Sequence, residues 1–245
     1  MDKLTHVEFS NYKKLMMKKY RRIERCFIIE GLHLIEEAIK KSIVKVIITS
    51  DREFICNDFK KIKYTSYQNI CTLSSTKTPQ PYIAICKFLD EQKFDANKNI
   101  LILNKINDPG NLGTLIRTAK AFEFENIIVE GVDIYNPKVL RSSQGAIFDI
   151  NIFNTNNLEK SLIELKQKHN FQIIGSFLDE KAQNYHSIKY DSKSIALVLG
   201  NEAKGIDKTI EKIVDLKTYI PINFESLNVA VAGGILMARL SNIKK

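Results

Sequence analysis

The sequence predicts an α/β protein in which helices cover both faces of a mostly parallel β-sheet. Two observations support this fold class. Short segments of apolar and β-branched residues alternate with helical segments, and the alternation restarts after a polar stretch about two-fifths of the way along the chain. The chain has 245 residues, of which 44% are hydrophobic, so it can bury one large core or two smaller ones without disulfides or a metal.

The first 92 residues are expected to form a small α/β domain. Its predicted elements are a helix near 11–22, strand Phe27–Ile29, helix Leu32–Lys40, strand Val44–Thr49, a short helix near 52–59 and an extended segment Tyr82–Phe88. The segment Phe88–Asn99 is polar, charged and without apolar periodicity, which is typical of a linker. We therefore predict two domains, at residues 1–92 and 97–245.

Strands and helices alternate again beyond this linker. The predicted strands are Ile100–Leu103, Ile127–Val129, Gln172–Gly175, Ile195–Leu199 and Leu216–Ile220. The predicted helices lie at about 111–122, 137–143, 158–169, 207–213 and 227–241. Such alternation is typical of a parallel sheet with helices on both faces.

The longest strongly apolar stretch, Val229–Leu240, does not predict a membrane span. It is interrupted by Gly233, Gly234 and Arg239 and is shorter than the roughly 20 residues that cross a bilayer. Residues 1–8 carry acids early and no apolar segment, so we expect neither a secretory signal nor a transit peptide. The expected location is a reducing cytoplasm, with no membrane partner.

The cysteines and histidines indicate neither a disulfide framework nor a metal site. Cys26, Cys56, Cys71 and Cys86 form no CxxC pair, and the four histidines lie at no metal-ligand spacing from them. We expect four buried thiols and no bound metal.

Positive charge is concentrated in the first part of the chain. The formal net charge is +9, and residues 1–99 hold 19 Lys and Arg against 12 Asp and Glu, so this part contributes +7. The densest basic segment contains Lys13, Lys14, Lys18, Lys19, Arg21, Arg22 and Arg25. On a helix these residues would share one face and contact phosphates of a polyanion, although a solvated surface is the simpler alternative.

The glycine patterns exclude the common nucleotide sites. No predicted strand is followed by GxGxxG, and Gly110–Gly113 lacks the third glycine of that motif. Gly200 and Gly205 have the spacing of a phosphate loop, but Ile206–Asp207 replaces the lysine and hydroxyl that would hold phosphate and magnesium.

Three polar segments instead follow the carboxyl ends of predicted strands, where ligands bind in open α/β sheets. In the first, an Asp-Pro-Gly turn precedes Asn111, which would serve equally well as a helix N-cap. Arg117 lies six residues later among apolar residues, where an unpaired buried guanidinium would be costly. An arginine at this position indicates a need for its forked hydrogen-bonding geometry and not for charge alone.

The second and third segments each have a ligand-binding interpretation and a purely structural one. Gly200 and Gly205 follow a buried strand and would permit close approach of the backbone to a ligand, or simply form a turn. Ser226 and Asn228 precede a helix rich in small residues and would be ordinary as cap residues.

Together and in this order, the three segments closely resemble the motifs of the SpoU/TrmH family within the SPOUT RNA methyltransferases. The matching residues are Asn111 and Arg117–Ala119, then Leu199–Glu202 with Gly205–Ile206, then Ile220–Pro221 with Ser226–Val229. This resemblance covers about residues 97–245. The preceding part is similar to the ribosomal-protein-like substrate-binding domain often fused to that family, with Phe27–Gly31 and Thr78–Gln80 at the characteristic places.

The resemblance implies a deep trefoil knot, an obligate homodimer and methyl transfer from S-adenosylmethionine to a ribose 2′-hydroxyl of RNA. The cofactor-binding residues it implies are Leu199, Gly200, Asn201, Ile220 and Leu227. The catalytic residues it implies are Arg117, Asn111, Ser226, Asn228 and Glu202. Arg117 is expected to orient the hydroxyl and the neighbouring phosphate, because arginine is effectively never deprotonated. The stretch between Pro221 and Ser226 is shorter than the glycine-containing form common in the family.

By analogy, the fused binding domain favours structured ribosomal RNA of the 23S type as substrate. The alternatives are a transfer RNA substrate and a non-catalytic factor for ribosomal RNA binding or assembly. The joint presence of the five implied catalytic residues favours the enzyme, because a scaffold would have no need of all five.

Overall fold

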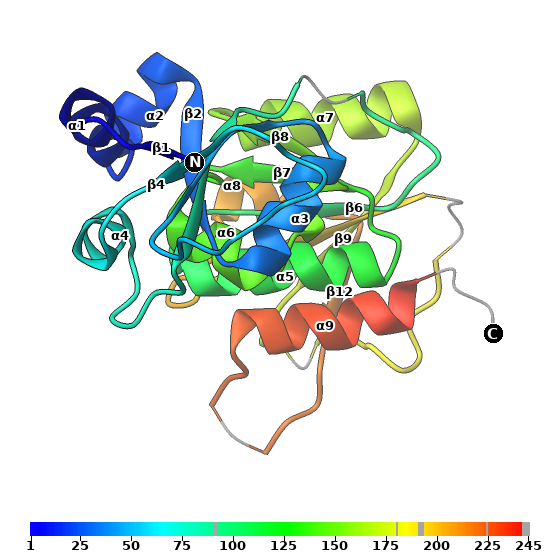
Figure 1. Ribbon diagram of the computed structural model, residues 1–245. Helices are drawn as coiled ribbons and strands as arrows, with labels where there is room; N and C mark the ends of the chain where they lie inside the picture. Colours follow the sequence, from blue (N-terminus) through cyan, green and yellow to red (C-terminus); the bar gives the residue numbers. More distant parts are fainter. Residues whose placement is uncertain (91–92, 180, 191–193, 224, 242–245) are drawn as a thin grey trace. The chain divides into compact units, whose positions relative to one another are not determined.

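The computed structural model describes residues 1–90, 93–179, 181–190, 194–223 and 225–241 (Figure 1). The chain divides into two compact units. Unit 1 contains Met1–Glu91 and Asp133–Phe148, and unit 2 contains Gln92–Val132 and Asp149–Lys245. The first division falls within the predicted linker, but the chain then passes between the units twice more, which the sequence did not predict.

The segment Asp133–Phe148 belongs to unit 1 through both polar and aromatic contacts. Asp133 forms an ion pair with Arg21. The ring of Tyr135 stacks on Phe27 and Phe88, with centroid distances of 4.6 and 4.0 Å. The helix at 137–143 was predicted correctly from the pattern of apolar residues. Such a pattern indicates a helix but does not show which of two hydrophobic cores the helix packs against.

Unit 1 is built on a mixed five-stranded sheet. The strand order is β1 (Asp2–Lys3), β4 (Ile62–Tyr64), β3 (Val44–Thr49), β5 (Tyr82–Lys87) and β2 (Cys26–Glu30). β5 runs antiparallel to both of its neighbours, and the other pairs are parallel. The sequence predicted β2, β3 and β5 and missed the short strands β1 and β4.

Two predicted helices of unit 1 need correction. The helix expected near 11–22 is two helices, α1 (His6–Lys14) and α2 (Lys18–Glu24), because the backbone is extended at Met17, the N-cap of the second. α1 begins with a capping box formed by Thr5 and Glu8. The helix expected near 52–59 does not form, and residues there adopt turns and irregular backbone.

The remaining helices of unit 1 pack on this sheet. They are α3 (Leu32–Lys40), α4 (Tyr67–Leu73), α6 (Pro137–Ser143) and the short 3₁₀ helix at Ala146–Phe148. One sheet face, including Cys26, Val46 and Ile85, forms a core with residues of α4 and the α1 region. Of the predicted buried thiols, Cys26 and Cys86 are buried, whereas Cys56 is partly exposed and Cys71 is exposed. Burial raises the pKa of the Cys86 thiol.

Unit 2 has the predicted parallel sheet. The strand order is β10 (Gln183–Asn184), β12 (Leu216–Tyr219), β9 (Gln172–Ser176), β11 (Ile195–Leu199), β6 (Ile100–Leu103), β7 (Asn126–Glu130) and β8 (Asn151–Thr155). Each neighbouring pair among these strands is parallel. The two edge strands, β8 and β10, were not predicted from the sequence.

Helices cover both faces of this sheet, as predicted. They are α5 (Pro109–Ala121), α7 (Leu158–His169), α8 (Lys208–Glu211) and α9 (Val229–Leu240). Apolar residues of α7 and α8 share a core with Ile100, Ala196 and Val198. α9 packs against α5 on the face of Leu199: a Cβ on Gly233 would lie 2.6 Å from Leu115 and 2.7 Å from Leu199. Gly233 therefore serves close packing inside this chain. Within the part of the chain that the structure describes, no helix combines the length and apolar character needed to cross a membrane.

Candidate functional site

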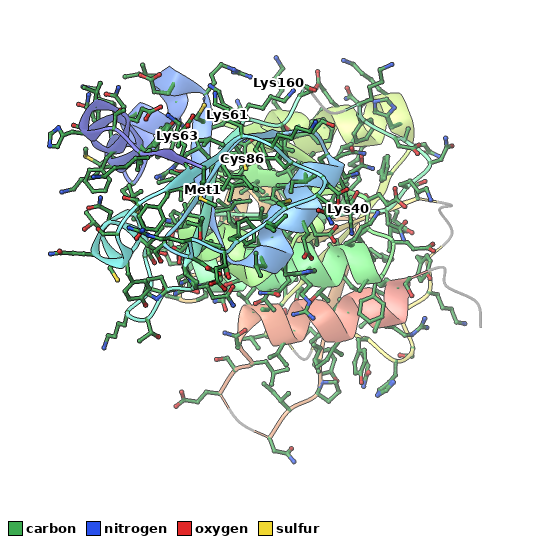
Figure 2. All side chains as sticks on the ribbon, in the orientation of Figure 1. Met1, Lys40, Lys61, Lys63, Cys86 and Lys160 are labelled. Carbon is green, nitrogen blue, oxygen red and sulfur yellow. The ribbon has the colours of Figure 1, made fainter. Side chains whose placement is uncertain are left out.

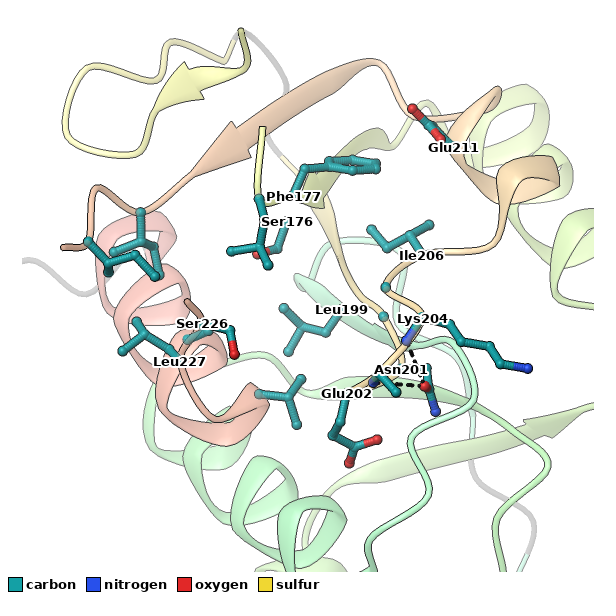
Figure 3. A pocket seen from close by; sticks show the side chains of 18 of the residues that line it. Ser176, Phe177, Leu199, Asn201, Glu202, Lys204, Ile206, Glu211, Ser226 and Leu227 are labelled. Atoms are coloured by element: carbon teal, nitrogen blue, oxygen red, sulfur yellow. Dashed lines mark hydrogen bonds between the residues drawn. The ribbon is translucent and has the colours of Figure 1, made fainter. Parts of the chain in front are cut away.

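A cavity of about 470 Å³ lies in unit 2 beside the carboxyl ends of β9, β11 and β12 (Figure 3). All five implied cofactor-binding residues line it: Leu199, Gly200, Asn201, Ile220 and Leu227. Among the implied catalytic residues, Glu202 and Ser226 also line it. In Figure 3, Ser226 and Leu227 lie on one side of the cavity and Lys204 and Ile206 on the other. The structure thus brings together the second and third motifs at the edge of a sheet where such folds bind ligands.

One wall of this cavity is the loop from Gly200 to Ile206, which is closed by its own backbone. The N–H of Asn201 donates to the carbonyl of Gly205 at 3.0 Å, and the N–H of Gly205 donates to the carbonyl of Asn201 at 2.9 Å. The Asn201 side chain accepts from the N–H groups of Ala203 and Lys204 and donates to the carbonyl of Lys105. Asn201 therefore shapes the wall with its side chain.

The glycine at 200 is required by this loop rather than by the space for a ligand. A Cβ there would lie 2.2 Å from the carbonyl carbon of Gly205 and 2.3 Å from the nitrogen of Ile206. The expectation that Gly200 leaves room for a ligand is thus wrong in its reason, because the loop's own backbone already fills that room. Gly205 is needed for a different reason, since its φ of +69° lies in the left-handed region.

Asn104, which was not predicted as a site residue, anchors the far end of the loop. Its side chain is buried, donates to Glu130 Oε2 at 3.0 Å and to Asp207 Oδ2 at 3.3 Å, and accepts from the N–H of Asp207 at 2.8 Å. Its own N–H donates to the carbonyl of Leu199 at 3.0 Å. Asn104 therefore ties both ends of the loop to the end of β6. A polar residue directly after the apolar run 100–103 was the available sequence signal.

The negative charge of Asp207, beside Asn104, is neutralised by a lysine. Lys105 Nζ forms an ion pair with Asp207 at 2.5 Å. The hydrogen bond from Lys105, aided by Asn104, holds the pKa of Asp207 below its usual value against the opposing effect of burial. Asp207 is therefore a carboxylate at neutral pH and accepts hydrogen bonds from both neighbours.

A chain of hydrogen bonds joins the three motifs. Asn111 Nδ2 donates to Glu202 Oε1 at 3.0 Å, and Asn228 Nδ2 donates to Asn111 Oδ1 at 3.0 Å. Asn228 also caps α9, accepting from the N–H of Ala230 at 2.9 Å. Asn228 therefore caps α9 and contacts Asn111 at the same time.

Asn111 is not the N-cap of α5. Asp108 occupies that position and accepts from the N–H of Asn111 at 2.9 Å, with Pro109 in the first helical turn. The sequence alternative that made Asn111 the cap is wrong. Because Asp108 satisfies the backbone, the Asn111 side chain is left to contact Glu202 and Asn228.

Glu202 is held as a carboxylate by this network. Burial by itself would raise the pKa of Glu202, but the hydrogen bonds from Asn111 and from the backbone of Glu202, Asn107 and Asp108 outweigh it, so the pKa lies below its ordinary value. The negative charge fixes the amide orientation of Asn111, since a carboxylate can only accept hydrogen bonds.

Arg117 does not match the burial expected from its neighbours. Leu115, Ile116 and Ala119 are buried, but the Arg117 side chain is exposed. It does not line the cavity, and within the described residues it has no hydrogen-bond or ion-pair partner. The apolar face of the helix packs inward, and position 117 lies on the solvent side. Apolar residues next to Arg117 in the sequence therefore did not show that its side chain is exposed.

The basic segment of unit 1 is exposed with one exception. Lys13, Lys14, Lys18, Lys19 and Arg22 are exposed. Arg21 is 4% exposed, donates to the carbonyls of Leu15 and Met16 at 2.7 and 2.8 Å, and pairs with Asp133. Its expected phosphate contact is wrong, because its guanidinium is already enclosed by partners of unit 1.

Comparisons with known proteins agree with this geometry. The SpoU rRNA Methylase family model matches residues 98–238, and the MRM3-like substrate binding domain model matches residues 10–84. The 23S rRNA (guanosine(2553)-2′-O)-methyltransferase RlmP of Bacillus subtilis (strain 168) is 38% identical over 238 residues, which cover 94% of each chain.

Two solved structures share the fold over almost the whole chain. One, described as an RNA methyltransferase of the TrmH family from Porphyromonas gingivalis, has a TM-score of 0.84 and 25% identity, covering 97% of this chain and 98% of its own. The other, an AdoMet-bound rRNA methyltransferase from Sinorhizobium meliloti, has a TM-score of 0.83 and 25% identity, covering 98% and 95%.

Proposed function

Because the chain belongs to the SpoU rRNA methylase family, we propose that it transfers a methyl group from S-adenosylmethionine to a ribose 2′-hydroxyl of 23S-type ribosomal RNA. The resemblance indicated by the three motifs is thereby confirmed at the level of the family. The observation that carries the proposal furthest is the hydrogen-bonded chain Glu202–Asn111–Asn228 beside the cavity.

The cavity residues fit S-adenosylmethionine. Apolar side chains of Leu199, Ile206, Ile220 and Leu227 offer a surface for an adenosine group, and the backbone of the 200–206 loop offers hydrogen-bonding groups. Two carboxylates, Glu202 and Glu211, and two ammonium groups, Lys204 and Lys208, line the same cavity, so its charged side chains balance formally. When bound, the cofactor supplies an electrophilic methyl group on a positively charged sulfur.

The chain's own residues must then align and activate a poor nucleophile. Positioning a ribose hydroxyl against the methyl group can supply several kcal/mol, and assistance to departure of its proton roughly 10²–10⁴-fold. We assign the orienting role to Arg117, whose fork can contact the hydroxyl and a neighbouring phosphate together. Ser226 and the amides of Asn111 and Asn228 would complete the site. The contact of Glu202 with Asn111 supports a role for Glu202 in holding the loop in place.

We also propose a homodimer and the trefoil knot of SPOUT proteins. Since Arg117 is exposed and outside the cavity of its own chain, a second subunit is one means of enclosing the ribose between Arg117 and a cavity. Light scattering at micromolar concentration should give about twice the chain mass of 28.1 kDa. A mass of one chain for an active enzyme would contradict the dimer. With ribosomal RNA as substrate, the site of action is the cytoplasm.

Transfer of tritiated methyl groups from S-adenosylmethionine to RNA tests the function. The expected result is incorporation into 23S ribosomal RNA and one phosphodiester that resists alkaline cleavage, because the attacking 2′-oxygen is blocked. Incorporation into transfer RNA alone would change the substrate. A methylated base would overturn the ribose chemistry, and no incorporation into either RNA would favour a non-catalytic assembly factor.

A further inference from the structure

A second cavity, of about 210 Å³, lies within unit 1, where three lysines from different parts of the chain meet. Lys14 comes from the end of α1, Lys45 from β3, and Lys61 from the segment before β4. Tyr12, Glu24 and Cys26 are also among its lining residues. We call it the lysine cavity (Lys61 is labelled in Figure 2).

A β-bulge directs Lys45 into the lysine cavity. Val44 pairs with Cys86 and Val46 with Ile85, so Lys45 is the extra residue in the strand. In a regular strand, consecutive side chains point to opposite faces, yet Lys45 and Val46 both line the cavity. Lys45 Nζ reaches Cys26 Sγ at 3.4 Å. Bulges commonly redirect a side chain in this way next to functional sites.

The three ammonium groups are not neutralised by neighbouring carboxylates. Nearby Lys63 is paired with Glu8, whereas Lys14, Lys45 and Lys61 form no ion pair within the ranges that the structure covers. Lys14 donates to the neutral Asn11 Oδ1 at 3.1 Å. Of the described residues lining the cavity, Glu24 is the one carboxylate, so lysine charge exceeds acidic charge by two.

The walls strengthen the attraction for an anion. Leu15, Val46 and Ile85 are buried and form an apolar part of the lining. Positive charges in a concave site with low-dielectric walls focus the electric field and raise the local concentration of anions. Three lysines spread over a flat surface would lack this focusing, which distinguishes the cavity from an ordinary solvated surface.

We propose that the lysine cavity binds a phosphate of the RNA backbone. This inference rests on the proposed function, because that function makes RNA the polyanion that the enzyme must hold at a distance from the reacting ribose. Lys14 belongs both to the cavity and to the exposed basic segment, so a bound strand would pass from one to the other. Phosphate contacts fix position without reading sequence, which suits a site made of lysines.

The test compares full-length variants in binding to a 23S ribosomal RNA transcript over a range of salt concentrations. The double variant Lys45→Gln/Lys61→Gln should bind several-fold more weakly and lower the slope of log K against log salt by about one. The control Lys40→Gln removes one exposed charge from the end of α3, a helix outside this cavity, and should change neither quantity. Glu24→Gln should bind RNA more tightly than the wild type. Thermal melting of each variant verifies folding.

Equal affinity and slope for the double variant, or an equal loss in Lys40→Gln, would overturn the proposal. A second arm adds inorganic phosphate and follows the ¹⁵N resonance of the Lys45 ammonium group, with chloride as control. A shift with phosphate, but unchanged RNA binding in the double variant, would assign the cavity to free phosphate and overturn the RNA contact. Because RNA binding is measured without catalysis, an inactive wild type would refute the proposed function and leave this test intact.

Discussion

The cavity of unit 2 and the lysine cavity of unit 1 have different linings, although each lies beside a β-sheet. In unit 2, the wall is a backbone loop held by Asn104 and Asn201, with apolar side chains facing the space. In unit 1, three exposed lysines, whose stems are flexible, supply the positive charge of the lining. A small ligand is recognised by a fixed shape, whereas a polyanion needs only charge at the right positions. Substitutions should therefore have different signatures in the two units.

The largest expected effect is on turnover in unit 2. Arg117→Ala should keep folding and cofactor affinity, since Arg117 is exposed and outside the cavity, but should lose roughly 10²-fold or more in kcat because the hydroxyl is no longer oriented. Arg117→Lys should not restore the rate, because a point charge cannot reproduce the guanidinium fork. Single-turnover methyl transfer and calorimetry measure the two properties. An Arg117→Ala enzyme with a near-native rate would refute its assigned role.

The next largest effect is on the stability of unit 1, where Arg21 is buried and its basic neighbours are exposed. Arg21→Met should lower the free energy of unfolding by about 3 kcal/mol, because it leaves the partly buried Asp133 carboxylate unpaired. Urea unfolding measures the loss.

The matched control removes four exposed charges from the same segment. Changing Lys13, Lys14, Lys18 and Lys19 to Gln should leave stability within about 0.5 kcal/mol. It should weaken RNA binding most at low salt and flatten its salt dependence. If Arg21→Met is as stable as the wild type, or if the four-lysine variant binds RNA normally, the division between them is wrong.

A smaller effect concerns the anchor of the cavity loop. Asn104→Ala removes the hydrogen bonds to Glu130 and Asp207 and should weaken cofactor binding by about tenfold, since a loop that must be ordered on binding reduces affinity. Calorimetric titration with S-adenosylmethionine measures it. Asn97→Ala is the control, because the Asn97 side chain donates to the nearby Asp95 and Asn97 does not line the cavity. Unchanged affinity in a folded Asn104→Ala protein would show that the loop keeps its shape without this anchor.

The smallest effect is the acid sensitivity of unit 1. The hydrogen bond from Lys63, with those from Thr5, lowers the pKa of Glu8 to about 2. A carboxyl whose folded pKa is depressed stabilises the fold above its ordinary pKa, near 4.5, and loses that contribution as the pH falls toward 2. Because this pair is partly exposed, the contribution should stay below about 1 kcal/mol. Glu8→Gln should therefore flatten the change in unfolding free energy between pH 5 and pH 3, and an unaltered pH profile would contradict the assignment.

The sequence predicted regular elements well where apolar periodicity was strong. The helices at 32–40 and 158–169 and the strands at 44–49 and 195–199 form with the predicted bounds. Short edge strands such as β10 were missed because two residues carry no periodic signal. The helix expected near 52–59 failed because residues 51–53 form a side-chain turn, in which Asp51 accepts from the N–H of Glu53.

The sequence predicted which residues belong to the candidate site better than it predicted their burial and contacts. Asn111, Glu202 and Asn228 meet in space although 117 residues separate the first from the last, a contact that no local pattern contains. The burial of Arg21 and the exposure of Arg117 were both predicted in reverse. Each depends on which helix face meets a core, and for Arg21 the partner Asp133 comes from a distant segment.

The membership of residues 133–148 in unit 1 has a consequence for synthesis on the ribosome. When β6, α5 and β7 of unit 2 have already been translated, the nascent chain still lacks Asp133 and Tyr135. Arg21 then has no carboxylate partner, and Phe27 and Phe88 lack the ring that stacks between them. Unit 1 therefore cannot be completed before translation has passed Phe148, so three elements of unit 2 are already on the nascent chain when unit 1 acquires its last segment.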